Sequence, residues 1–177
     1  AFDQYWTFEA SAVGKSDGRT AVLFTNLTWD TAVIGRDRAF RDIRNWIDAS
    51  IQLFAQRPDD RLVVRVHPSE VHLPGKGTRD SLGAYIDRRW DVLPANVSVV
   101  PADDPQSSYE LMATADLGLV YTSTTGLEMA LTGTPVVVAG ETHYRDKGFT
   151  VDVADAEEFR QEVIRLLADP SSGPVDV

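Results

Sequence analysis

The stretch LGLVYTSTTGLEMALTGTPVVV, residues 117–138, decides the fold because it reads as a strand, a helix and a second strand. Leu117–Tyr121 and Val136–Val138 are short apolar runs, as buried strands are. Thr124–Leu131 between them has the composition of a helix, and Gly133-Thr134-Pro135 turns the chain into the next strand. A helix that crosses between two neighbouring strands implies that the strands run parallel.

The same alternation extends along the chain in both directions. Further strands are expected at Thr20–Leu27, Leu62–Val66 and Val97–Val100. Further helices are expected within Asp37–Gln56, Leu82–Trp90, Tyr109–Thr114 and Phe159–Leu167. The pattern predicts an α/β fold, a Rossmann-like open parallel sheet of about five or six strands with helices on both faces. We expect residues 1–19 to be a linker or N-terminal extension, 20–170 the Rossmann-like domain and 171–177 a tail.

Composition narrows the class of partner. The chain has 177 residues and a formal net charge of −10, which argues against nucleic acid and against anionic membranes as partners. No apolar run approaches the length of a transmembrane helix, and we expect no signal peptide after Ala1. There is no cysteine, so disulfides and thiolate metal sites are excluded. We therefore expect a cytoplasmic protein.

Hydroxyl side chains follow the strand at Leu117–Tyr121. Ser123, Thr124 and Thr125 are adjacent, and Gly126 would let a ligand approach the backbone. Such a cluster at the start of a helix is suited to a phosphate, because the first backbone N–H groups have no partner within the helix. The alternative is plain capping, with Ser or Thr as N-cap and Glu128 completing a capping box. Both readings use the same end of the helix.

Polar residues also follow the other strands, at the edge of the sheet where nucleotides bind. His67-Pro68 ends the second strand, where the imidazole could donate to a phosphate; a structural histidine is the alternative. Arg65 shares a face with His67, and Glu70 lies just beyond. Glu128 could accept hydrogen bonds from ribose hydroxyls, or be an ordinary exposed carboxylate.

Two loops complete the expected cleft. Asn26, Thr28 and Asp30 follow the first strand, where the alternative is a simple turn. Tyr144, Arg145 and Lys147 follow the strand at Val136–Val138, and a cation there could pair with the carboxylate of an anionic sugar; a solvated loop is the alternative. The Gly-x-Gly-x-x-Gly fingerprint is absent, which argues against NAD and FAD. No histidine pair has metal-ligand spacing, so we expect neither cofactor nor metal.

An ordered set of motifs resembles one family. These are LFTNLTWD (23–30), RVHPSE (65–70), YTSTTGLE (121–128), GTPVVVAG (133–140) and residues 144–150. At these residues the chain resembles the capsule polysaccharide biosynthesis family, and within it the enzymes that build the Kdo (3-deoxy-manno-octulosonic acid) linker of bacterial capsules. The His67-Pro68 pair and the pair of hydroxyl residues at Ser123 and Thr124 are also similar to those of bacterial sialyltransferases, which use CMP-sugars.

The resemblance implies a GT-B glycosyltransferase in which this chain matches the C-terminal, donor-binding half. It implies a CMP-activated donor, CMP-Kdo, with His67 and Ser123 or Thr124 on the phosphate and Glu128 on the ribose or base. The acceptor half, which would carry the acidic catalytic residue, is the expected partner, and peripheral membrane association of the full enzyme is compatible with this. By itself the chain is expected to bind nucleotide and not to turn over. Half of a GT-B-type nucleotide-sugar epimerase and a non-catalytic binding module are the alternatives.

Overall fold

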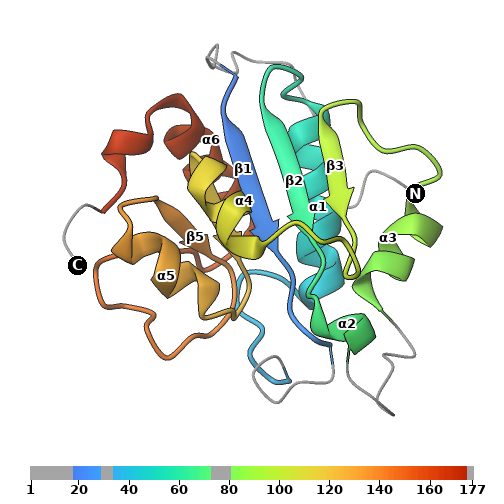
Figure 1. Ribbon diagram of the computed structural model, residues 1–177. Helices are drawn as coiled ribbons and strands as arrows, with labels where there is room; N and C mark the ends of the chain where they lie inside the picture. Colours follow the sequence, from blue (N-terminus) through green and yellow to red (C-terminus); the bar gives the residue numbers. More distant parts are fainter. Residues whose placement is uncertain (1–17, 29–33, 73–80, 175–177) are drawn as a thin grey trace.

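A computed structural model describes residues 18–28, 34–72 and 81–174, which form one twisted sheet with helices on both sides (Figure 1). All strand pairs are parallel, in the order β3-β2-β1-β4-β5-β6. The strands are β1 (Thr20–Phe24), β2 (Arg61–Arg65), β3 (Val97–Val100), β4 (Leu117–Val120), β5 (Val136–Val138) and β6 (Val151–Asp152). The predicted Rossmann-like parallel sheet is confirmed.

The strand order reverses beside β1. From β1 the chain moves outward through β2 and β3, then crosses back to β4 on the other side of β1 and continues to β5 and β6. The loops that follow β1 and β4 therefore lead to opposite faces of the sheet, and α/β proteins bind ligands where the strand order reverses in this way. Topology alone places the candidate site at this end of β1 and β4.

Two helical layers cover the sheet (Figure 1). The α1 layer consists of α1 (Ile43–Ala55), α3 (Leu82–Arg89) and α6 (Ala156–Ala168), and the α4 layer of α4 (Ser108–Thr114) and α5 (Thr125–Leu131). Two short elements complete the set, α2 (Ser69–His72) and the 3-10 helix η1 (Pro170–Ser172). Within the described ranges, no helix combines the length and the apolar character needed to cross a bilayer.

The core divides between these layers. On the α1 side, Trp46 and Phe54 of α1 and Phe159 of α6 have no exposed surface. The Phe159 ring meets Phe40 edge to face, with ring centroids 5.2 Å apart. On the α4 side the buried cluster is built mainly from valines of the strands and Met129 of α5. The larger side chains, and hence most of the apolar area removed from water, lie in the α1 layer.

Some boundaries differ from the sequence prediction for local reasons. The helix expected from Asp37 begins only at Ile43, because Asp42 is its N-cap and accepts a hydrogen bond from the Asn45 amide at 2.9 Å. Asp37 instead forms an isolated antiparallel bridge with Gly140. The strands at Thr20 and Leu117 end earlier than expected, and α2 and β6 were not predicted. A four-residue helix and a two-residue strand are too short to show periodicity.

A polar clasp closes the amino-terminal end of β2 and β3. Arg57 and Asp60 form an ion pair at 2.6 Å, with both side chains at least 98% buried. The Asn96 side-chain amide donates to the carbonyl oxygens of Phe54, Arg57 and Asp60 at 2.7–2.9 Å. These contacts hold the turn that follows α1 against the residue that precedes β3.

Candidate functional site at the carboxyl edge of the sheet

Two consecutive residues after β1 join the ends of its neighbouring strands. Thr25 and Asn26 are 2% and 8% exposed. The Thr25 hydroxyl accepts a hydrogen bond from the His67 amide at 2.9 Å, beyond the end of β2. The side-chain oxygen Oδ1 of Asn26 accepts a longer hydrogen bond from the Thr122 amide at 3.4 Å, beyond the end of β4. Since adjacent strands are about 4.8 Å apart, the ends of β2 and β4 lie roughly 10 Å apart on one rim.

His67 stands on this rim in a defined tautomer. Its side chain is half-buried, and Nδ1 accepts a hydrogen bond from the Ser69 amide at 3.1 Å. A neutral imidazole that accepts at Nδ1 carries its hydrogen on Nε2, so Nε2 is the donor atom of this ring. Pro68 follows, half-buried, at the start of the turn into α2. The local backbone thus fixes which nitrogen could donate to an anion.

The loop between β4 and α5, called the hydroxyl loop after Ser123 and Thr124, lies on the same rim. Ser123 Oγ donates to Thr125 Oγ1 at 2.8 Å and accepts from the Thr125 amide at 3.2 Å. Thr124 is exposed and occupies the N-cap position without a side-chain capping bond. Glu128 is the fourth helical residue, not the third. The capping-box interpretation is therefore wrong for this helix; a capping box is present instead in α4, between Ser107 and Glu110.

Tyr144 fastens the loop after β5 onto the hydroxyl loop. It is 3% exposed, and its hydroxyl donates to the carbonyl oxygen of Ser123 at 2.5 Å. Burial, assisted by the charge of Asp152, raises the pKa of Tyr144, so the hydroxyl remains protonated as a donor. A Cβ on Gly126 would lie 2.5 Å from this hydroxyl. The glycine thus admits Tyr144, a sufficient reason for its presence that requires no ligand.

Three further candidate side chains also have partners within the protein. Arg65 is 4% exposed and donates to the Pro101 carbonyl at 2.5 Å, which holds the loop after β3. Glu70 is 4% exposed and accepts from the Leu82 amide at 2.8 Å, at the start of α3. Arg145 donates to the carbonyl oxygens of Gly140 and Val153 at 3.2 and 2.8 Å. These residues shape the rim, and their contact with a ligand stays a prediction.

Glu128 faces a cavity between α4 and α5. The cavity has a volume of about 350 Å³, and Tyr109, Met112, Thr132 and Thr134 line it with Glu128. Tyr109 is 69% exposed, which is unusual for a tyrosine ring next to a cavity. Sequence reasoning missed Tyr109 as a site residue. An aromatic residue in the first turn of a helix that follows a parallel strand was the signal that could have found it.

A second hollow of about 450 Å³ lies beside the loop after β1. Thr28 lines it together with Ile34, Asp37 and Arg44. Asp37 accepts a hydrogen bond from the hydroxyl of the buried Tyr121 at 2.5 Å. Burial and this carboxylate raise the pKa of Tyr121. Thr28 lines this hollow and not the cavity that Glu128 faces.

Two candidate site residues remain, Lys147 and Asp30. Lys147 is exposed in the loop after β5. Asp30 lies outside the described residues. In the part of the chain that the structure describes, no group of three histidine, aspartate or glutamate side chains is arranged to hold a metal ion.

The sequence matches the family model for capsule polysaccharide biosynthesis proteins over residues 7–170. Solved structures share the fold. The KpsC β-Kdo 2,4-transferase of Thermosulfurimonas dismutans is 18% identical with a TM-score of 0.58, over 98% of this chain and 51% of that one. The β-Kdo 2,7-transferase of the same organism's KpsC is 18% identical with a TM-score of 0.52, over 81% of this chain and 41% of that one.

A third structure belongs to an epimerase. UDP-GlcNAc 2-epimerase from Neisseria meningitidis, solved with UDP-GlcNAc, is 15% identical with a TM-score of 0.54, over 90% of this chain and 38% of that one. Identities this low show the fold alone, one Rossmann-like half of a GT-B architecture. No curated protein matches the sequence. The chain spans 38–51% of the length of these three structures. Since the family model extends over most of its length, the protein belongs to the capsule polysaccharide biosynthesis protein family.

Proposed function

We propose that this chain is the donor-binding half of a capsule glycosyltransferase and that it takes a CMP-activated sugar, CMP-Kdo. One observation carries the proposal: Thr25 and Asn26 hold the ends of β2 and β4 on a common rim, where His67 and the hydroxyl loop flank the strand-order reversal. Membership of the capsule family supports the reaction class. The two similar KpsC structures are those of Kdo transferases, and this similarity supports the donor.

The phosphate of CMP would lie between His67 and the hydroxyl loop. The Nε2–H group of His67 and the hydroxyl of Thr124 are donors, and a phosphate oxygen is a strong acceptor. When the bond from the sugar to the phosphate breaks, the departing CMP gains negative charge on that oxygen. Donors already in place stabilise this charge more than they stabilise the bound donor sugar, which lowers the barrier.

The nucleoside would extend from the rim toward the cavity between α4 and α5. Glu128 can accept hydrogen bonds from both ribose hydroxyls, since an ionised carboxylate has two acceptor oxygens. The exposed ring of Tyr109 is available for stacking on the base. Stacking of a base on an aromatic side chain contributes about 1–3 kcal/mol. Lys147 is the exposed cation of the loop after β5, suited to the carboxylate of an anionic sugar.

Sugar transfer needs a second half in this proposal. The chain spans 38–51% of the solved structures that it resembles, and the acceptor and the acidic catalytic residue are assigned to the other half. The complete enzyme would work in the bacterial cytoplasm, at the inner face of the membrane. Alone, the chain should bind CMP and transfer no sugar; measured transfer by the isolated chain would contradict this division.

Calorimetric titration with CMP, cytidine and UDP tests the proposal and separates its parts. CMP should bind more tightly than cytidine, because the phosphate adds charge-assisted hydrogen bonds, each contributing about 1.5–3 kcal/mol. CMP should also bind more tightly than UDP. Absence of CMP binding at millimolar concentration would refute the proposal.

Two sets of variants assign the contacts. Thr124→Ala and His67→Ala should weaken CMP binding roughly tenfold while leaving cytidine binding unchanged, because both contacts are to phosphate. Glu128→Gln should weaken both ligands. Ser98→Ala removes an exposed hydroxyl on β3, away from the rim, and is the matched control. If Thr124→Ala together with Ser123→Ala changes no ligand's affinity, a non-catalytic binding module is favoured instead.

A nucleotide-sugar epimerase half is the second candidate. The similarity to UDP-GlcNAc 2-epimerase, with a TM-score of 0.54, favours it as strongly as the fold comparison favours the transferases. The same titration decides between the two, because the epimerase reading requires a preference for UDP over CMP.

A further inference from the structure

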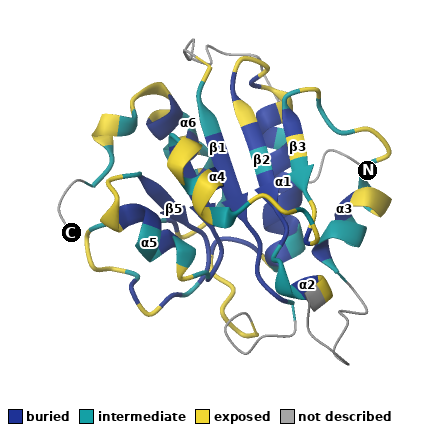
Figure 2. Ribbon diagram, viewed as in Figure 1, coloured by how far each residue is buried: buried dark blue, intermediate teal, exposed yellow. Residues whose placement is uncertain are grey.

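The cavity between α4 and α5 has two chemically different sides. Met112 and Ala113 line it from α4 and are apolar, which suits the face of a flat ring. Glu128 and Thr132 line it from α5 and its C-cap, and both carry oxygen atoms. Figure 2 shows that these two helices carry exposed and half-buried residues beside buried strands. The oxygen-bearing side therefore decides which edge of a bound ring the cavity accepts.

The hydroxyl of Thr132 uses its hydrogen within the protein. Its Oγ1 donates to the carbonyl oxygen of Met129 at 2.8 Å. The amides of Thr132 and Thr134 donate to the same carbonyl oxygen, each at 3.1 Å, and Gly133 turns the chain between them with a φ of 82°. A hydroxyl has one hydrogen and two lone pairs. Thr132 Oγ1 therefore presents only an acceptor to the cavity.

Thr132 follows Glu128 by one helical turn. Residues four apart on a helix are neighbours, with Cβ atoms about 5–6 Å apart. Glu128 is also an acceptor, since an ionised carboxylate has no hydrogen to donate. A nucleoside whose ribose is bound by Glu128 can thus extend its base along α5 as far as Thr132, with Tyr109 on the α4 side of the same cavity.

An acceptor at this position distinguishes the two common pyrimidines. Cytosine carries an amino group at position 4, which donates hydrogen bonds. Uracil carries a carbonyl oxygen there, as thymine does, and that oxygen is an acceptor. Two acceptors at hydrogen-bond distance repel each other, and neither is satisfied. A fixed acceptor therefore favours cytosine and opposes uracil.

We propose that Thr132 is the residue that selects cytosine over uracil, by accepting a hydrogen bond from the 4-amino group of the base. This role rests on the proposed function, in which Glu128 holds the ribose and Tyr109 stacks on the base. It adds the specificity for the base, which the fold shared with both transferases and an epimerase does not decide.

Calorimetric titration with CMP and UMP tests the role of Thr132, because the two ligands share ribose and phosphate and differ only in the base. The unmodified protein should bind CMP more tightly than UMP. Thr132→Val replaces the hydroxyl with a methyl group of similar size. We expect it to weaken CMP binding about fivefold, the contribution of one hydrogen bond, and to leave UMP binding unchanged or stronger. Thr132→Ser retains the hydroxyl and should retain the preference.

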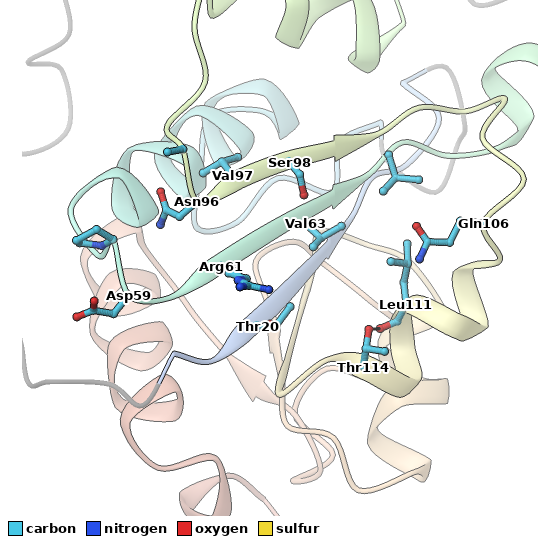
Figure 3. Close-up of a pocket in the computed structure, with 13 residues that line it drawn as sticks. Thr20, Asp59, Arg61, Val63, Asn96, Val97, Ser98, Gln106, Leu111 and Thr114 are labelled. Atoms are coloured by element: carbon cyan, nitrogen blue, oxygen red, sulfur yellow. Dashed lines mark hydrogen bonds between the residues drawn. The ribbon is translucent and has the colours of Figure 1, made fainter.

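Thr114→Val is the matched control. The Thr114 hydroxyl donates to the carbonyl oxygen of Leu111 at 3.0 Å, three residues earlier, as Thr132 donates to Met129. Both threonines are exposed at the end of a helix of the α4 layer. Thr114, however, lines a separate hollow of about 850 Å³ beside β2 and β3 (Figure 3). Its replacement should change neither affinity.

The possible failures can be told apart. If the unmodified protein prefers CMP and Thr132→Val weakens CMP and UMP by the same factor, the role of Thr132 is overturned while the proposed function stands. If the unmodified protein binds UMP as tightly as CMP, both the role of Thr132 and the CMP-activated donor are overturned. Absence of binding of either nucleotide at millimolar concentration would refute the nucleotide site itself.

Discussion

The two helical layers of this domain differ in what they bury and in what they leave accessible. In the α1 layer, α1 and α6 have 13 residues each and bury Trp46, Phe54 and Phe159 completely. In the α4 layer, both helices have seven residues, and Tyr109 and Glu128 line an open cavity. Large buried side chains stabilise the first layer, whereas the second has an accessible cavity, where we propose that the nucleoside binds. Substitutions should therefore separate stability from binding according to layer.

The largest effect on stability is expected at Trp46. The Trp46→Ala variant removes a fully buried indole that packs against Tyr121, with ring centroids 5.4 Å apart. We expect the free energy of unfolding to fall by about 3–5 kcal/mol, as for other buried aromatic residues replaced by alanine. Urea denaturation followed by circular dichroism measures it.

Tyr109→Ala is the counterpart of this variant in the α4 layer. Because the ring is 69% exposed, its loss should change the free energy of unfolding by no more than about 0.5 kcal/mol. It should weaken CMP binding nonetheless. A Tyr109→Ala protein as unstable as Trp46→Ala would break the contrast between the layers.

Gly126→Ala tests a place where the α4 layer is tightly packed. The added Cβ would lie 2.5 Å from the Tyr144 hydroxyl and 2.9 Å from Val120 Cγ2, so the loop after β5 must move. We expect a loss of about 1–3 kcal/mol in the free energy of unfolding.

Tyr144→Phe provides the control because it removes the hydroxyl that the new methyl group would meet. In the Tyr144→Phe background, Gly126→Ala should lower the free energy of unfolding by less than it does in the unmodified protein. The double-mutant cycle measures the difference. Tyr144→Phe alone should cost about 1 kcal/mol, the contribution of its hydrogen bond to Ser123. Strict additivity would show that the two groups do not clash.

A pH dependence of stability also arises in the α1 layer. Burial, with the hydrogen bond to Asp48, raises the pKa of Tyr85 to about 12. The unfolded chain loses this proton near pH 10, before the folded chain does, so it binds fewer protons between these values. The contribution of Tyr85 to the free energy of unfolding is therefore fully present below pH 10 and is lost as the pH rises toward 12. In Tyr85→Phe this fall should be smaller, as denaturation at pH 8 and pH 10.5 would show; equal losses would contradict the assignment.

Much of the fold was predictable because parallel strands carry a strong local signal. Val97–Val100 and Val136–Val138 have the same bounds in the sequence prediction and in the structure, since each is a short valine-rich run that borders a proline, Pro101 after the first and Pro135 before the second. β6 has two residues, Val151 and Asp152, and follows a loop instead of a helix. Its position depends on pairing with β5, which no local pattern encodes.

The candidate site also has a part that the sequence predicts and a part that it does not. The positions of His67 and Ser123 on one edge follow from strand order, which a sequence of alternating strands and helices makes predictable. The partners of Arg65, Glu70 and Tyr144 do not follow from it. Arg65 contacts Pro101, Glu70 contacts Leu82, and Tyr144 contacts Ser123, each across 12 or more positions. Such contacts depend on where separate loops meet in space.

The clasp at Asn96 has a consequence for how the protein is produced. Asn96-Val97-Ser98 fits the acceptor pattern for N-linked glycans, and its side-chain nitrogen is the atom that a glycan would modify. In the folded domain this nitrogen donates to three carbonyl groups, so there is no room for a glycan. A secretory eukaryotic host that glycosylates the nascent polypeptide would therefore yield molecules unable to close this end of the sheet. Bacterial or cell-free synthesis avoids the conflict.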